Sequence, residues 1–199
     1  GKSTLMSILF GLYQAEKGSI KINEKPVKIN NPNDASSLKI GMVHQHFKLV
    51  HNFTVLESII LGRETVKMGV IKKDEARKKV IALSERYKLR IDPDAYISDI
   101  TVGMQQRVEI LKMLYSDSEI LIFDEPTAVL TPQEIDELMK IMKELVSEGK
   151  SIIFISHKLN EIKKVADRCT VLRKGKCIGT VDVETTSKEQ MSEMMVGRK

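Results

Sequence analysis

The sequence contains no tryptophan, and aromatic residues make up only 5% of its 199 residues. Proteins that bind nucleic acid usually combine stacking aromatics with a clustered basic stripe. The lysines and arginines here are spread along the chain, and the net charge is a mild +5. We therefore expect no nucleic-acid partner, and we attribute the small excess of positive charge to nucleotide binding or solubility.

Long hydrophobic runs and cysteines are also scarce. No apolar stretch approaches the roughly 20 residues that a membrane-spanning helix needs, and no signal peptide is visible. The two cysteines, Cys169 and Cys177, are too few for a disulfide framework, and we expect two reduced, mostly buried thiols. The apolar content of 42% is enough for the core of one α/β domain.

The most informative stretch is an apolar run at 120–123 that is followed at once by Asp124, Glu125 and Pro126. Four bulky apolar residues between polar flanks predict a strand buried on both faces, as in a parallel sheet. Ligands bind at the C-terminal ends of such strands. One carboxylate can hold a metal while the other handles a water, although an acidic turn without function has the same pattern.

About twenty residues upstream, Thr101, Val102, Gly103, Met104 and Gln105 precede a helical pattern. A hydroxyl and exposed amides at a helix N-terminus make an anion site. An ordinary capped helix is the better explanation of these residues when they are taken alone.

The chain starts with Gly1, Lys2, Ser3 and Thr4, followed by an apolar helical pattern. These four residues match the end of G-x-x-x-x-G-K-[ST], the loop whose amides cradle phosphates. In that motif the lysine reaches the β- and γ-phosphates and the hydroxyl ligates Mg²⁺. The fragment alone is a weak signal, and its place ahead of the other two motifs strengthens it.

In order and spacing, the motifs resemble the nucleotide-binding domain of an ATP-binding cassette (ABC) transporter across essentially the whole chain. The variant motifs after the third strand and in the signature resemble those in the first cassette of bacterial sugar- and nucleoside-uptake ATPases. Those proteins carry two cassettes in one longer chain. The matched motifs are the end of Walker A at 1–4, the Q-loop at Gln45, the signature at 100–107, Walker B at 120–125, the D-loop at 128–131 and the H-loop at His157.

The resemblance implies an α/β P-loop NTPase fold with a RecA-like, mainly parallel sheet core. It adds a small antiparallel β subdomain and an α-helical subdomain inserted at about 53–116. The whole of 1–199 is then a single ABC ATPase domain, which we expect to be incomplete at its N-terminus, within Walker A.

The resemblance also assigns roles in binding ATP and Mg²⁺ and in hydrolysis. Glu125 positions or deprotonates the attacking water, and His157 contacts the γ-phosphate. The phosphates are held by Gly1, Lys2, Ser3 and Thr4, and the metal by Ser3, Gln45 and Asp124. The signature residues Thr101, Val102, Gly103, Met104 and Gln105 act in trans on ATP held by a facing cassette.

The implied partners are a second cassette, in tandem or as a dimer, and transmembrane permease subunits. An extracellular or periplasmic solute-binding protein takes part indirectly. The protein would work at the cytoplasmic face of the cell membrane, as a peripheral subunit. We expect the permease contact between Gln45 and Gly62, where Phe47, Leu49, Val50 and Phe53 are apolar without clear periodicity; a small local core is the alternative.

Three departures from the family pattern affect these expectations. Val102 and Met104 replace the glycine and glutamine of the common LSGGQ signature, and Val102 adds bulk where the backbone approaches phosphate. Thr131 replaces the usual D-loop aspartate. The adenine-stacking aromatic cannot be assigned, because in the family it precedes Gly1.

The rest of the chain has ordinary patterns. We expect helices at 4–14, 55–61, 74–87 and 185–199, hairpins at 18–29 and 171–178, and buried strands at 40–43 and 151–156. Thr131, Pro132 and Glu134 form a capping box for a further helix that Gly149 ends. His44, His46 and His51 suggest a metal site only weakly, because nothing nearby completes a ligand pattern.

Other readings remain open beside the transporter. A soluble ABC ATPase that acts on ribosomes is one, although the interval between Thr4 and Thr101 is too short for the coiled coils of the chromosome-structure type. A cassette that binds ATP and hydrolyses it poorly is another. A P-loop kinase would lack the signature and the H-loop.

Overall fold

The computed structural model describes residues 1–44, 49–61, 66–67 and 70–197, and for 66–67 and 70–71 the backbone only. The helices are α1 (Lys2–Leu9), α2 (Pro32–Ser37), α3 (Val55–Ile60), α4 (Lys73–Arg86), the 3-10 helix η1 (Ile97–Asp99), α5 (Val102–Tyr115), α6 (Pro132–Ser147), α7 (Leu159–Val165) and α8 (Lys188–Val196). The strands are β1 (Ile20–Ile22), β2 (Lys25–Val27), β3 (Ile40–Val43), β4 (Val66–Lys67), β5 (Val70–Ile71), β6 (Ile120–Asp124), β7 (Ser151–Ile155), β8 (Arg168–Arg173) and β9 (Lys176–Asp182).

The central sheet is parallel and has the order β3-β6-β7. Its register places Phe123 beside Val43 and Phe154, and Asp124 beside Ile155. The expected α/β class with a parallel core is therefore confirmed, and the β1-β2, β4-β5 and β8-β9 pairs are antiparallel.

Strand β6 is covered on both faces, as its apolar run predicts. Leu121 and Phe123 belong to the larger core cluster with α3, α5 and α6, whereas Ile122 belongs to the smaller one with Met6 of α1. Side chains alternate between the faces of a strand, so Asp124 lies on the same face as Ile122 and α1. This alternation points Asp124 toward the chain start.

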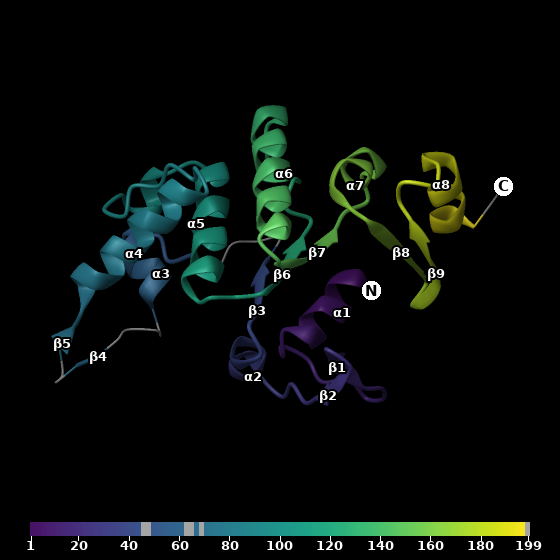
Figure 1. The fold of residues 1–199 in the computed structure, drawn as a ribbon, viewed down its shortest axis with the longest axis horizontal. Helices are drawn as coiled ribbons and strands as arrows, with labels where there is room; N and C mark the ends of the chain where they lie inside the picture. Colours follow the sequence, from purple (N-terminus) through teal and green to yellow (C-terminus); the bar gives the residue numbers. More distant parts are fainter. Residues whose placement is uncertain (45–48, 62–65, 68–69, 198–199) are drawn as a thin grey trace.

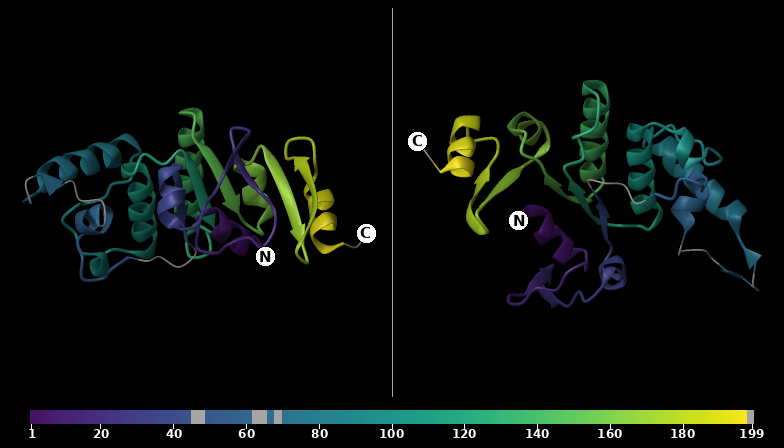
Figure 2. Two further views of the ribbon diagram at one scale, coloured as in Figure 1. Left: turned by 90° about the horizontal axis from the view of Figure 1, so that it is seen from below. Right: turned by 180° about the vertical axis from the view of Figure 1, so that it is seen from behind.

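The helices gather in three places around this sheet. In Figure 1, α3, α4 and α5 form a group at one end, α6 and α7 stand above β6 and β7, and α8 lies at the far end beside β8 and β9. The views in Figure 2 place α1 and the β1-β2 pair on the side of the sheet opposite α6. The N-terminus is therefore central and the C-terminus peripheral.

Capping residues and hydrophobic periodicity in the sequence predicted most helix ends correctly. Thr131 caps α6 with a complete capping box to Glu134, and Pro132 is the first helical residue. Helix α4 starts and ends within one residue of the expected 74–87. Helix α1 is shorter than expected: it ends at Leu9, and Gly11 follows with a φ of 81°, which only a residue without a side chain adopts easily.

Two burial expectations are wrong. Strand β7 is only partly buried, because it has a hydrogen-bonded neighbour on one side alone within the part of the chain that the structure describes. Cys177 is exposed on the β8-β9 hairpin and Cys169 is half-buried, because a two-stranded antiparallel pair leaves one face open. Both cysteines are free thiols.

No helix among the described residues is both long and apolar enough to cross a membrane.

Helix α4 is tied to the end of α6 by a polar contact. Tyr87 donates its hydroxyl hydrogen to the carboxylate of Glu148, which also pairs with Arg86 at 3.1 Å. Burial and, second, this bond raise the pKa of Tyr87 to about 12, whereas the Tyr87 hydroxyl lowers the pKa of Glu148 from 4.5.

We expect Tyr87→Phe to lower the free energy of unfolding near pH 7 by about 1 to 2 kcal/mol, because a bond to a charged acceptor is lost. Glu148 has a lowered pKa, so its contribution is present above 4.5 and is lost as pH falls through the folded pKa. Tyr87 has a raised pKa, so its contribution is present below 10.0 and is lost as pH rises toward about 12.

Denaturant unfolding of Tyr87→Phe and the parent protein should therefore differ most near neutral pH and converge at both extremes. Tyr13→Phe is the control, because its side chain is exposed. An equal difference at all pH values would contradict the assignment.

Candidate nucleotide site

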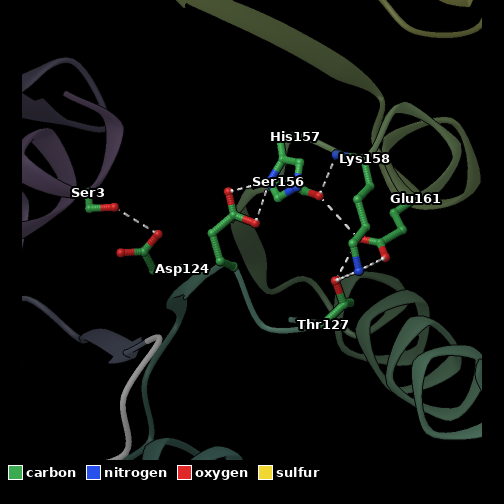
Figure 3. A network of polar contacts seen from close by, with 8 residues as sticks. Ser3, Asp124, Thr127, Ser156, His157, Lys158 and Glu161 are labelled. Carbon is green, nitrogen blue, oxygen red and sulfur yellow. Dashed lines mark hydrogen bonds and ion pairs between the residues drawn. The ribbon is translucent and has the colours of Figure 1, made fainter. Parts of the chain in front are cut away.

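The candidate site lies at the C-terminal ends of β6 and β7, where the parallel register brings Asp124 beside Ile155. Asp124 is buried, and the Ser3 hydroxyl donates to its Oδ1 at 3.1 Å. Figure 3 shows this pair beside the residues that follow β7. Two residues that are 121 positions apart are thus brought together, as the motif hypothesis requires.

Glu125 contacts the expected histidine. His157 Nδ1 lies 3.1 Å from both Oε1 and Oε2 of Glu125. The Glu125 side chain is 16% exposed and that of His157 is 64% exposed, so the imidazole borders open space while the carboxylate is shielded. A carboxylate next to an accessible imidazole can hold and align a water.

The backbone at Glu125 has a left-handed conformation, with a φ of 47°. Such a conformation costs a residue with a side chain about 1 kcal/mol or more and persists only where surrounding contacts impose it. The Glu125 N–H donates to the Ile155 carbonyl at 3.0 Å, and the Pro126 carbonyl accepts from the side-chain amide of buried Gln106. The turn is therefore held from the neighbouring strand and from α5.

The phosphate-loop residues open α1. Gly1 is its N-cap and exposed, Lys2 is half-buried, and Ser3 and Thr4 are exposed in the first turn. Hydroxyl and carboxylate oxygens are the ligands that Mg²⁺ prefers, so the pair of Ser3 and Asp124 fits that ion. Gln45, the third expected ligand, lies outside the described residues, as does Phe47.

The signature residues start α5. Thr101 caps the helix by accepting from the Met104 N–H at 3.3 Å, Val102 is 46% exposed, Gly103 is buried, and Gln105 is half-buried. Figure 1 places α5 and α1 on different sides of β3. The structure thus groups Ser3, Asp124, Glu125 and His157 at one place and the signature residues at another.

Thr131, which stands at the D-loop position, is the N-cap of α6. Its hydroxyl takes part in the capping box with Glu134, whose Oε2 accepts from the Thr131 N–H at 2.9 Å. Leu49 lies within the expected permease segment 45–62 and packs against the main core, while Val50 is exposed. The two neighbours therefore differ, and only Val50 is available to a partner.

Gly103 lies close to the Glu134 side chain of α6. A Cβ atom at this position would lie 2.1 Å from Glu134 Oε1. We expect Gly103→Ala to displace Glu134, open the capping box and lower the free energy of unfolding by about 1 kcal/mol. In a Glu134→Ala background the same change should cost much less. Equal costs in both backgrounds, measured by denaturant unfolding, would contradict this explanation.

Four residues around the site were not expected from sequence: Thr127, Ser156, Lys158 and Glu161, which surround the turn at Glu125 and the segment at His157. Gln106 lies within the matched signature at 100–107, but its contact with the Pro126 carbonyl was not expected. Thr127, Ser156 and Glu161 are buried. Their positions after a strand or at a helix start do not indicate this burial, because solvent-exposed polar residues occur there too. Among the described residues, no three His, Cys, Asp or Glu side chains gather as a metal cluster.

Comparisons with known proteins show the family and the fold of the chain. A family model described as "ABC transporter" matches residues 1–128. In the solved structures, cbiO1 of Clostridium perfringens, part of an ABC transporter complex, has a TM-score of 0.77 at 29% identity over 98% of this chain and 76% of its own. A nucleotide-free ATP-binding cassette has a TM-score of 0.82 at 21% identity, over 98% and 80% respectively, and supports the fold alone.

The fold, together with the site at the ends of its parallel strands, defines the chain as a P-loop NTPase. The chain belongs to the ABC transporter family.

Three curated relatives match all of this chain. The nucleoside import ATP-binding protein NupA of Lactococcus lactis is 58% identical over 198 residues, and the guanosine import ATP-binding protein NupO of Bacillus subtilis is 60% identical over 198 residues. A putative carbohydrate transport ATP-binding protein of Mycoplasma pneumoniae is 50% identical over 208 residues. The chain covers 39%, 39% and 36% of their lengths, so it spans about two fifths of these relatives.

Proposed function

We propose that this chain binds and hydrolyses ATP to power solute import by an ABC transporter. The observation that carries the proposal is the convergence of the pairs Ser3–Asp124 and Glu125–His157 on one end of the parallel sheet. ATP hydrolysis needs neutralised phosphates and an aligned water, and these two pairs supply the groups for each task.

The proposed roles follow from this placement. Lys2 and the amides of Gly1–Thr4 hold the β- and γ-phosphates at the start of α1. Mg²⁺ neutralises phosphate charge when bound, and Ser3, Asp124 and Gln45 would hold it, Asp124 through a water. Glu125 orients the attacking water and takes its proton, while His157 reaches the γ-phosphate from its exposed position.

The signature residues at 101–105 would close over ATP held by a second cassette. Exposed Val102 and exposed Val129 of the D-loop suit such a contact. Helices α3, α4 and α5 form the proposed helical subdomain at about 53–116. Permease subunits would dock at 45–62, which begins before this subdomain and enters it, at the cytoplasmic face of the membrane, with a solute-binding protein acting through them.

We further propose a nucleoside as the imported solute, with a simple sugar second. The relatives named for nucleoside or guanosine import are 58% and 60% identical, whereas the one named for carbohydrate transport is 50% identical. Specificity in this arrangement lies outside the cassette, so the proposal concerns the transporter that the chain serves.

The test is reconstitution of the full-length protein with its permease and solute-binding protein in lipid vesicles. We expect ATP hydrolysis to rise on addition of a nucleoside, and radiolabelled nucleoside to accumulate only with ATP. A rise with a simple sugar instead would reassign the solute. Stimulation by ribosomes or nucleic acid, with none by solute, would replace the transporter by a soluble ABC ATPase.

A further inference from the structure

The carboxylate of Glu161 is buried outside the groups that would touch ATP. Glu161 lies in the first turn of α7 and is only 7% exposed. Burying a carboxylate is costly unless partners compensate for its lost hydration. The partners of Glu161 should therefore explain how its burial is compensated.

Both carboxylate oxygens of Glu161 are occupied. Oε2 accepts from the Thr127 hydroxyl at 2.8 Å and from the Ser156 hydroxyl at 3.1 Å. Oε1 pairs with Lys158 Nζ at 3.4 Å, and that ammonium group also donates to Thr127 Oγ1 at 3.3 Å. The Ser156 oxygen in turn accepts from the Lys158 N–H at 3.0 Å. Figure 3 shows the closed network.

The partners of Glu161 belong to the two segments that carry Glu125 and His157. Thr127 lies two residues after Glu125, in the left-handed turn described above, whereas Ser156 and Lys158 flank His157. One carboxylate thus joins the turn after β6 to the segment after β7. The contact of 3.1 Å between Glu125 and His157 bridges the same two segments.

We propose that Glu161 is a positioning residue for ATP hydrolysis, which sets the Glu125–His157 geometry through Thr127, Ser156 and Lys158. This inference rests on the proposed function. Glu161 is a better candidate for this task than a surface ion pair, because its burial and the three contacts of its carboxylate leave it little freedom. Loss of its carboxylate would free the strained turn at Glu125.

The experiment measures ATP hydrolysis and ATP binding by the full-length protein with Glu161→Ala, Glu161→Gln, Thr127→Val or Ser156→Ala. A misplacement of about 1 Å at a reacting group can slow a reaction on the order of 100-fold. We expect Glu161→Ala to lower kcat by about 10- to 100-fold while the Kd for ATP stays the same. Glu161→Gln should recover most of the rate, because its amide oxygen still accepts from both hydroxyls.

Glu148→Ala is the matched control. Glu148 also accepts from a hydroxyl, that of Tyr87, and pairs with a cation, Arg86, but it joins α4 to the end of α6. We expect a lower Tm for both alanine variants and a lower kcat for Glu161→Ala only. In addition, His157→Ala combined with Glu161→Ala should slow hydrolysis less than the product of the two single effects, because both act on one geometry.

Each outcome decides the inference. A kcat for Glu161→Ala equal to that of the parent, or a loss that Glu161→Gln does not relieve, overturns it. If Glu161→Ala does not fold, Thr127→Val and Ser156→Ala carry the test, and an unchanged kcat in both overturns it as well. Absence of ATP hydrolysis by the parent full-length protein would instead refute the proposed function, which keeps the two failures distinct.

Discussion

Glu125→Gln is expected to abolish most ATP hydrolysis and to leave ATP binding intact. The amide keeps the size of the side chain, but it cannot accept a proton from water. General-base catalysis contributes roughly 10² to 10⁴ in rate, so we expect a loss of about 100-fold or more in kcat. The measurement is steady-state phosphate release by the full-length protein with the second ATP site inactivated.

Glu119→Gln is the control for that change. Glu119 immediately precedes β6, the strand that Asp124 ends, and pairs with Lys39 on the surface. Exposed ion pairs contribute little, so this variant should match the parent in turnover and ATP affinity. Unchanged turnover in Glu125→Gln, or a loss that follows lost ATP binding, would remove Glu125 from the proposed role.

Asp124→Asn should make hydrolysis depend on a higher Mg²⁺ concentration. The Asp124 carboxylate is buried beside the Ser3 hydroxyl, where it can orient a metal-bound water. The neutral amide removes one negative charge, and lost outer-shell partners typically weaken metal binding by about 10- to 100-fold. A titration of ATP hydrolysis with Mg²⁺ should show the midpoint shifted by that factor.

The corresponding control is Asp136→Asn on α6, where the carboxylate is exposed and pairs with Lys164 at 3.0 Å. Its Mg²⁺ midpoint should not move. If Asp124→Asn also left the midpoint unchanged, Asp124 would not support the metal. A lower rate at every Mg²⁺ concentration with the same midpoint would likewise contradict the proposal.

The two variants separate the two acidic neighbours at the end of β6. Side chains alternate along a strand, so Asp124 faces α1 whereas the turn carries Glu125 toward His157. We expect one change to affect the metal dependence and the other the proton transfer. On this proposal the adjacent carboxylates would have different tasks, because the strand ends between them.

Features set by neighbours in the chain were predictable from sequence. The apolar run of β6 and its acidic end, the capping box of Thr131 and Glu134, and the bounds of α4 depend on periodicity and caps within a few residues. The family resemblance rests on the same short motifs. The α/β class and the end of the sheet where the site lies follow from them.

Other features were decided only when distant segments packed. The parallel register places Glu125 and Thr127 opposite the segment after β7, and Glu161 then meets hydroxyls 34 and 5 positions away. Gly103 likewise has its steric partner on α6. No local pattern distinguishes such a buried carboxylate from an exposed one at a helix start, because burial depends on which strands pair and which helix covers them.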